Sequence, residues 1–516
     1  MNNENNIETE IKLTTVSQEL LESVLYMPII QERIVPDSEK DKYLESHYYD
    51  TPKRKFAKAG IVFRVRKEPE GFVATVKTEK ANSGGLSERM EYNVDLPDEK
   101  PAFAGFSKIN FLVDLKAIVD KDGPVEELFS VLVQRKQCNL ALTQETVVEM
   151  AIDTGEIVAG EKRMPVCEIE FEIKHGNSKE LIEFVALLAK EMPLFAEQKS
   201  KYYRGCELAG EKTELIKAVP ASEISLAKPF KSSLQAALIK QTGYALSMVS
   251  DCVADKDKLS DLHEALGQLE RMLSFSKTLF NEGECREQIK IIHTAISLLE
   301  TCDLVERFSY KWQKLNKRTE SIHSTLLLEK LLQEKSSYYE NQVQDSLVGG
   351  KYSALLFSLW SWLEEENWQD NVEVSGKEYL YERISQINDE ILSYYAKDDV
   401  MRIYEKVLDL HCGITVMKKF AGKDIKNFGK VAKKLLKNLE NKVQAEKIAK
   451  VLFSLFRTSA GRLLYRDAGM LLGYYFNQYS IKANKIQKNL EEFKEAGSIF
   501  TIAGTDEKHN ENEHEE

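Results

Sequence analysis

Charged side chains recur at every second residue in two short segments that lie far apart in the chain. The first segment is Glu8-Thr9-Glu10-Ile11-Lys12, and the second is Cys167-Glu168-Ile169-Glu170-Phe171-Glu172-Ile173. Because successive side chains of a β-strand point to opposite faces, each segment would gather its charges on one face and its apolar residues on the other. Carboxylate oxygens on such a face are the ligands that Mg²⁺ and Mn²⁺ prefer.

Basic residues occur at the same spacing in other strand-like segments of the first two hundred residues: Arg64-Val65-Arg66, Lys77, Arg89 before Glu91, Arg135 and, near the end, Lys201. Asp153 is expected at a turn within residues 151–156. Each pattern alone is common on solvated strands, and an acidic strand also discourages edge-to-edge aggregation. Their joint occurrence predicts an enclosed cavity in which carboxylates hold a divalent metal while Arg and Lys neutralise a polyphosphate.

The composition indicates a soluble protein with more than one core. The 516 residues carry a net charge of −12, with 43% hydrophobic and 30% charged residues, which argues against general nucleic-acid binding. No apolar run reaches the ~18 residues that span a bilayer. The polar N-terminus lacks the features of a secretory signal. Seven scattered cysteines without a Cys-x-x-Cys motif predict a reduced, cytoplasmic protein.

The two halves of the chain have different local patterns. All eleven prolines lie between Pro28 and Pro229, so the remainder is expected to be all helical. The first half has short alternating runs separated by turn residues, with helices expected at 17–26 and 178–191. We therefore expect an α+β protein with a strand-rich domain at 7–208, a linker at 209–228, an all-helical domain at 229–504 and a disordered acidic tail at 505–516.

The order of the charged motifs resembles the CYTH family, the triphosphate tunnel metalloenzymes, from about residue 7 to 208. The resemblance also rests on the motifs His47-Tyr48-Tyr49-Asp50-Thr51-Pro52, Thr75-Val76-Lys77, Asp153-x-Gly155-Glu156 and Ser200-Lys201. It implies an eight-stranded antiparallel β-barrel that forms a tunnel with flanking helices. It also implies metal-dependent hydrolysis of a triphosphate, with Mg²⁺ or Mn²⁺ as the cofactor.

The resemblance also assigns roles to individual residues. Those that would surround the metals are Glu8, Glu10, Glu91, Asp153, Glu168 and Glu170. Those that would bind the phosphates are Lys12, Arg64, Arg66, Lys77, Arg89, Arg135 and Lys201. Either Glu168 or Glu170 would orient the attacking water, and the sequence does not choose between them.

The helical half resembles the CHAD family, which often follows CYTH and binds polyphosphate through a histidine and regularly spaced basic residues. The matching residues here are His263, Arg271, His411, Lys418 and Lys419, whereas Leu266, Glu270 and Ile414 replace expected basic residues. A lysine series from Lys419 to Lys437 is interrupted by Gly422 and Gly429, so it need not form one face. The alternative to polyphosphate binding is a protein-interaction platform or a solvated surface.

The arrangement of the two halves resembles the bacterial inorganic triphosphatases, which predicts hydrolysis of inorganic triphosphate (tripolyphosphate) to diphosphate and phosphate. The alternatives are a thiamine-triphosphatase, a class IV-type adenylate cyclase, or a non-catalytic polyphosphate-binding scaffold. Neither a membrane nor a nucleic acid is expected as a partner. Retention of all the carboxylates argues against a pure anion-binding scaffold, because negative charge weakens the binding of an anion.

Overall fold

The computed structural model divides the chain into two compact units. The first comprises 1–219, 242–256 and 347–365, and the second comprises 220–241, 257–346 and 366–516. The residues that it describes are 7–78, 82–83, 85–106, 114–211, 220–221, 223–226, 228–318, 327–365, 367–368, 375–397, 399–456, 461–480 and 483–500. The tail expected at 505–516 and most of the inner part of the expected linker lie outside these residues.

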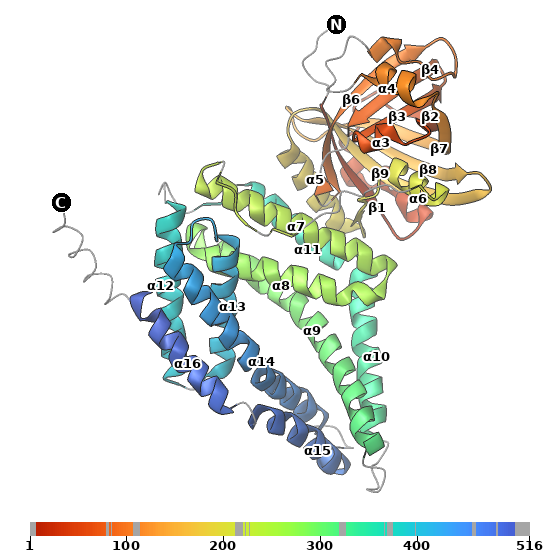
Figure 1. Cartoon of the computed structure of the whole chain (residues 1–516). Coiled ribbons are helices and arrows are strands. Elements are labelled where there is room, and N and C mark those ends of the chain that lie inside the picture. Colours follow the sequence, from red (N-terminus) through yellow and green to blue (C-terminus); the bar gives the residue numbers. More distant parts are fainter. Residues whose placement is uncertain are drawn as a thin grey trace, which may run out of the picture. The chain divides into compact units, whose positions relative to one another are not determined.

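Eight antiparallel strands of the first unit close into a barrel, which confirms the expected fold class (Figure 1). The strands are β1 (Ile7–Thr14), β2 (Lys40–Asp50), β3 (Ile61–Glu68), β4 (Gly71–Thr78), β6 (Leu86–Leu96), β7 (Glu126–Ala141), β8 (Val147–Ala159) and β9 (Lys162–His175). Their order around the barrel is β1-β9-β8-β7-β2-β3-β4-β6, and pairing of β6 with β1 closes the ring. The short strands β5 (Asn82–Ser83) and β10 (Phe195–Ala196) extend the sheet.

The apolar face of the barrel wall points outward, and helices cover parts of it. On β9, Ile169 and Phe171 are fully buried, and Phe171 packs edge-on against Phe184 of a covering helix with ring centroids 5.6 Å apart. The helices of this region are α1 (Gln18–Ser23), α2 (Pro28–Gln31), α3 (Lys55–Lys58), α4 (Leu115–Asp122), α5 (Ser178–Glu191) and α6 (Lys201–Ala209), with 3-10 turns η1 (Val24–Tyr26) and η2 (Ala104–Phe106). Since strand side chains alternate, the charged residues between the apolar ones face the interior.

Strand β1 is the seam of the barrel. Its first five residues pair with β6, from Ile7 opposite Met90 to Ile11 opposite Leu86. Its later residues pair with β9, where Glu10 lies opposite Glu172 and Lys12 opposite Glu170. The two charged segments that are far apart in the sequence are therefore neighbours in the barrel wall.

The turn expected at Asp153 is wrong, because this residue lies in the middle of β8. Gly155 is therefore not a turn residue. An ideal Cβ at this position would lie 2.0 Å from the Leu132 carbonyl oxygen, so glycine permits close approach of β7 and β8. The helix expected at 178–191 is confirmed as α5, whereas the one expected at 17–26 is divided into α1 and η1.

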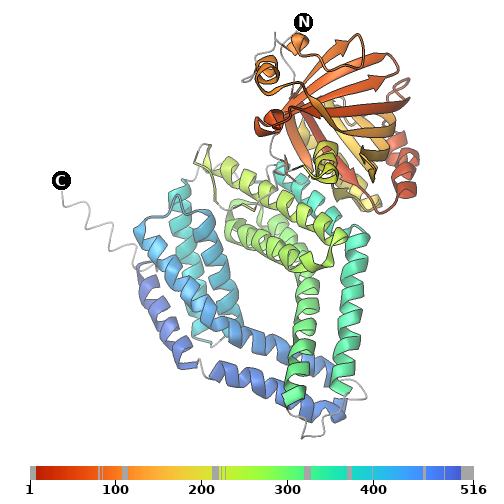
Figure 2. The same ribbon diagram turned by 45° about the vertical axis from the view of Figure 1, so that its right-hand side comes forward.

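The rest of the described chain is helical, as expected (Figure 2). Its helices are α7 (Phe230–Ala254), α8 (Leu259–Ser276), α9 (Glu282–Arg318), α10 (Leu327–Val348), α11 (Lys351–Glu364), α12 (Gly376–Tyr395), α13 (Val400–Val416), α14 (Lys423–Phe456), α15 (Gly461–Ser480) and α16 (Ala483–Gly497), with η3 (Lys256–Lys258), η4 (Lys277–Leu279) and η5 (Ser498–Phe500). In the second unit, α13 packs against α8, α12 and α14. In the first unit, α11 packs against α5. None of the described helices has the length and apolar character needed to cross a membrane.

The lysine series of the second half lies mainly on one unbroken helix. Gly429 lies inside α14 and does not interrupt it. Its missing side chain makes room for Ile414 of α13, whose methyl carbon would lie 3.0 Å from a Cβ at this position. Lys423, Lys430 and Lys437 are all exposed on this helix. These lysines therefore form an exposed basic face on α14, and both expected alternatives, a solvated surface and an anion-binding face, remain open.

Candidate active site

The interior of the barrel holds a cavity of about 590 Å³ with a charged wall. All eight barrel strands and the start of α6 contribute residues to this wall. Eleven of the thirteen predicted site residues line the cavity: Glu8, Glu10, Lys12, Arg64, Arg66, Lys77, Arg89, Glu91, Arg135, Glu170 and Lys201. The other two, Asp153 and Glu168, are fully buried and contact the lining residue Lys201. The structure therefore brings the whole predicted set together.

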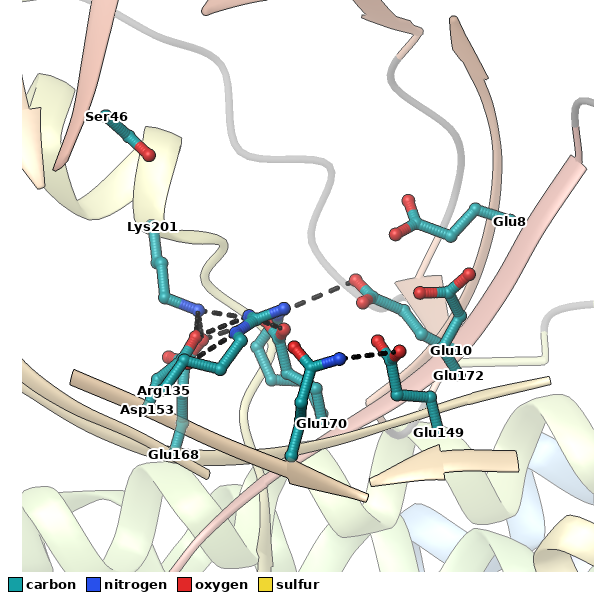
Figure 3. A network of polar contacts seen from close by, with 12 residues as sticks. Glu8, Glu10, Ser46, Arg135, Glu149, Asp153, Glu168, Glu170, Glu172 and Lys201 are labelled. Atoms are coloured by element: carbon teal, nitrogen blue, oxygen red, sulfur yellow. Dashed lines mark hydrogen bonds and ion pairs between the residues drawn. The ribbon is translucent and has the colours of Figure 1, made fainter. Parts of the chain in front are cut away.

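Three carboxylates form a tight group at one side of the cavity (Figure 3). Oxygen atoms of Asp153, Glu168 and Glu170 lie within 4.8 Å of one another. Two cations hold them together. Lys201 Nζ lies 2.6 Å from Asp153 and 2.9 Å from Glu170, and it also contacts Glu168. Arg135 donates to Asp153 and to Glu170, both at 2.6–2.7 Å.

Lys12 links this group to the seam strand. Its amine contacts Glu170 and lies 3.5 Å from both Glu10 and Glu168. Burial alone would lower the pKa of Lys12, but the charges of Glu170 and Glu168 outweigh burial and raise it above its usual value. Burial would likewise raise the pKa of Glu170, and the nearby Lys12, Lys201 and Arg135 hold it well below the usual range. Both groups are therefore charged at neutral pH.

A second group of ion pairs joins β1 to β4 and β6. Lys77 lies 2.8 Å from Glu8 and 2.6 Å from Glu91, so one amine joins two carboxylates. Arg89 lies 3.2 Å from Glu8 and also contacts Glu10. Figure 3 shows Glu8 and Glu10 on the opposite side of the view from Lys201. The acids that were predicted to bind metals are thus divided between two places in one cavity.

Arg64 and Arg66 differ from the other cations of the cavity. Within the described chain, Arg64 has no carboxylate at ion-pair distance, and its guanidinium donates to Thr75 Oγ1 at 3.1 Å. Arg66 donates to Ser46 Oγ at 3.1 Å, and its nearest carboxylate is Glu68 at 3.7 Å. Burial, together with the positive charges of Arg64 and Arg135, lowers the pKa of Arg66 to about 10. Burial would lower the pKa of Arg64, but the charges of Tyr48, Glu91 and Glu8 raise it. Arg66 is therefore the guanidinium of this pair whose positive charge is poorly compensated and suits an anion.

Sequence reasoning missed several charged residues of this site. Glu172 continues the alternation of Glu168 and Glu170, and that signal was available. Burial and the charges of Glu8 and Glu149 raise the pKa of Glu172, although Lys174 opposes the shift. The missed residues that line the cavity are Lys42, Glu68, Glu149, Glu172 and Lys174. Arg204, one helical turn after Lys201, contacts Glu168 but is not among the residues that line the cavity.

The cavity is nearly balanced in charge. Among the described residues, its lining contains nine basic and seven acidic ones, an excess of two positive charges. A polyphosphate with several negative charges would therefore be only partly neutralised by the protein. The carboxylates offer the hard oxygen ligands that suit Mg²⁺ or Mn²⁺, and such a cation would supply the missing positive charge. The donor set thus fits a metal-bound polyanion better than a bare one.

Comparison with known proteins identifies the barrel region. Residues 6–205 match the family model described as the CYTH domain. A curated relative, the inorganic triphosphatase of Haemophilus influenzae, is 34% identical over 164 residues, which are 32% of this chain and 45% of that relative. The chain therefore matches less than half the length of this relative.

Several solved structures are similar to this chain. One is a Hippeastrum protein described as an adenylyl cyclase with a dominant triphosphatase activity, at 18% identity and a TM-score of 0.29, covering 40% of this chain and 98% of that one. Another is PptA from Streptomyces chartreusis, at 11% identity and a TM-score of 0.40, covering 51% and 100%. The mimivirus capping-enzyme triphosphatase has 9% identity and a TM-score of 0.23, covering 36% and 88%.

Proposed function

We propose that the barrel hydrolyses inorganic triphosphate to diphosphate and phosphate with the help of Mg²⁺ or Mn²⁺. The observation that carries the proposal is the convergence of acidic and basic side chains from all eight strands on one interior cavity. Phosphoryl transfer needs positioning and neutralisation of the non-bridging oxygens rather than covalent chemistry by the protein. The CYTH domain and the curated relative named inorganic triphosphatase support the same reaction.

In this proposal the cations of the wall bind the phosphate chain. Arg64 and Arg66 attract it first, because Arg64 has no carboxylate at ion-pair distance in the described chain and the nearest one to Arg66 is 3.7 Å away. Lys12, Lys77 and Arg89 then exchange a carboxylate for a phosphate oxygen. Bidentate guanidinium contacts orient the chain for in-line attack.

The carboxylates released from these cations would hold the metal. Four of them line the cavity, namely Glu8, Glu10, Glu91 and Glu170. The other two, Asp153 and Glu168, contact Lys201, which lines it. A bound Mg²⁺ or Mn²⁺ would neutralise phosphate charge and acidify a water molecule. Between the two candidate carboxylates for orienting that water we favour Glu170, because it lines the cavity while Glu168 is fully buried.

The wall also favours inorganic triphosphate over its organic derivatives. In the part of the chain that the structure describes, the aromatic residues of the lining are Tyr48 and Tyr202, and both are buried. Tyr48 stacks on Phe129 at 4.8 Å, and Tyr202 packs against the same two rings. Their faces are therefore occupied and offer no platform for a nucleobase or a thiamine ring. This argues against the thiamine-triphosphatase and adenylate cyclase alternatives.

A substrate panel tests the proposal. Purified protein is given tripolyphosphate, thiamine triphosphate, ATP or long-chain polyphosphate, each with Mg²⁺, Mn²⁺ or chelator. We expect release of phosphate and diphosphate from tripolyphosphate, with a higher kcat/KM than for the other substrates. Release of pyrophosphate from ATP would replace the hydrolase by a cyclase. Binding of polyphosphate without turnover would support the scaffold alternative.

For the helical part we propose a CHAD-like module, with the basic face of α14 as its candidate polyphosphate-binding surface. The exposed residues Lys423, Lys430 and Lys437 on one continuous helix support this proposal. Full-length protein with Lys430 and Lys437 changed to Glu should lose salt-sensitive polyphosphate binding. Unchanged binding would leave the interaction-platform alternative. A cytoplasmic location is proposed as well, since none of the seven cysteines, all within the described residues, forms a disulfide.

A further inference from the structure

Arg204 is a nearly buried cation that the proposed reaction does not use. It lies on α6, where the Ser200 side chain accepts a hydrogen bond from the Tyr203 amide and so caps the helix. Gly205 fixes the helix against the barrel, because a Cβ there would lie 2.1 Å from the Phe129 ring. Lys201 and Arg204 are three positions apart in the sequence, so both project from the same face of α6.

Both side chains reach the same carboxylate. Glu168 is fully buried, and its two oxygen atoms have different partners. Lys201 contacts Oε1 and Arg204 contacts Oε2. Both contacts place a positive charge against a carboxylate that is shielded from water. Glu168 is thus a buried anion whose charge is neutralised from two sides.

Lys201 has three carboxylate partners, whereas Glu168 is the one carboxylate at ion-pair distance from Arg204 among the described residues. The charge of Glu197 acts on Arg204 from farther away. Lys201 Nζ lies near Asp153, Glu168 and Glu170 and also lines the cavity. If Lys201 turns toward a phosphate, each of these carboxylates loses part of its neutralisation. Asp153 and Glu170 would still be paired with Arg135. Among the described residues, Glu168 would be left with Arg204, which contacts it directly, and with Lys12 at 3.5 Å.

We infer that Arg204 is a positioning residue: it neutralises Glu168 from outside the cavity, so that Lys201 is available to bind a phosphate group of the substrate. The inference rests on the proposed function, since it assigns a phosphate to Lys201. An uncompensated buried carboxylate is costly. Without Arg204, Glu168 would hold Lys201 and weaken its contact with the substrate.

The test compares full-length variants in two assays. Equilibrium binding of tripolyphosphate is measured with chelator present, so that binding is read without turnover, and KM and kcat are measured with Mg²⁺. For Arg204→Met we expect about tenfold or greater loss of affinity and a similar rise in KM, with a smaller change in kcat. Arg204→Lys should retain most of the affinity, because it keeps the charge.

A double variant separates positioning from a general effect on the fold. In Arg204→Met combined with Glu168→Gln, the carboxylate that Arg204 pairs with loses its charge as well, so it no longer holds Lys201 and the affinity for tripolyphosphate should return to within a few-fold of the wild-type value. The control is Arg163→Met, which removes an exposed arginine of β9 that pairs with Glu156 of β8. It should leave both assays unchanged. The double variant also serves if Arg204→Met alone does not fold.

The outcomes distinguish this inference from the proposed function. If wild-type protein neither binds nor hydrolyses tripolyphosphate, the proposed function is wrong. If the wild type is active and Arg204→Met binds as tightly as it does, the positioning role of Arg204 is wrong while the function stands. A double variant that binds as weakly as Arg204→Met would also overturn the inference, because it would show that Arg204 acts on the substrate without Glu168.

Discussion

Replacing Arg66 by Met should make the barrel more stable and its substrate binding weaker. Arg66 lies beside two other guanidinium groups, and its nearest carboxylate in the described structure, Glu68, is 3.7 Å away. A cation in such a place raises the free energy of the folded protein, and a bound phosphate would relieve that cost. Met keeps most of the alkyl length of Arg and removes the charge.

The magnitude follows from the pKa of Arg66, which burial and the charges of Arg64 and Arg135 lower from its usual 12.5 to about 10. At about 1.4 kcal/mol per pKa unit, this corresponds to at most ~3 kcal/mol of destabilisation by the protonated group. Loss of the hydrogen bond to Ser46 offsets about 1 kcal/mol. We therefore expect Arg66→Met to increase the free energy of unfolding by roughly 1–2 kcal/mol.

The pH dependence of this gain has a definite sign. Because the folded state lowers the pKa of a base, the cost is present at every pH below about 10. It decreases only as the pH rises from there toward the unfolded value of 12.5. The gain should therefore be constant through the neutral range.

Urea unfolding followed by circular dichroism measures the stability, and equilibrium binding of tripolyphosphate measures the affinity. Lys12→Met is the matched control, since Lys12 is paired with Glu170. Breaking a buried pair costs about 3–5 kcal/mol, so this control should be destabilised while it also loses affinity. If Arg66→Met is destabilised as Lys12→Met is, or if it binds tripolyphosphate as well as the wild type, the reasoning from unpaired charge is refuted.

Three further predictions concern other parts of the molecule. Glu170→Gln should abolish tripolyphosphate hydrolysis while circular dichroism shows an intact fold, and wild-type turnover by this variant would exclude Glu170 from the reaction. Chelation of divalent cations should stop hydrolysis, and added Mg²⁺ or Mn²⁺ should restore it; phosphate release in excess chelator would count against a metal. In the second unit, burial raises the pKa of Asp409 from 3.8 to about 6, although Ser274 donates a hydrogen bond to it at 2.8 Å. The folded state thus binds the extra proton, so stability should fall as pH rises from about 4 to 6, and Asp409→Asn should be about 3 kcal/mol more stable than wild type above that range but equal to it below. Equal stabilities of Asp409→Asn and wild type at about pH 8 would show that burial of the ionised carboxylate does not destabilise the fold.

The inward direction of the charged residues could be predicted from the sequence, because a period of two is a local property of a strand. Glu8, Glu10 and Lys12 on β1 and Glu170 on β9 illustrate this, and the structure places them on one cavity wall. The identity of each ion pair could not be predicted. It depends on the register of β1 against both β6 and β9, which local patterns do not contain.

Two errors of sequence reasoning have physical causes. The Asp153-Thr154-Gly155 stretch was expected to be a turn because these residue types favour turns, but Gly155 is required where β7 and β8 approach closely. Arg204 was missed because its significance depends on the helical register of α6, which carries it to the carboxylate that Lys201 also contacts. A helix period beginning at Ser200 would have placed the two cations together.

The pairing of β1 with both β6 and β9 has a consequence for synthesis of the protein. This strand is the earliest of the barrel to leave the ribosome, yet one of its two neighbours, β9, ends at His175. The edge of β1 that pairs with β9 therefore stays unpaired while more than a hundred further residues are made. Such a long-range closure is slow and prone to wrong association. Its alternating Glu and Lys residues, which later serve the cavity, keep the waiting segment soluble in the meantime.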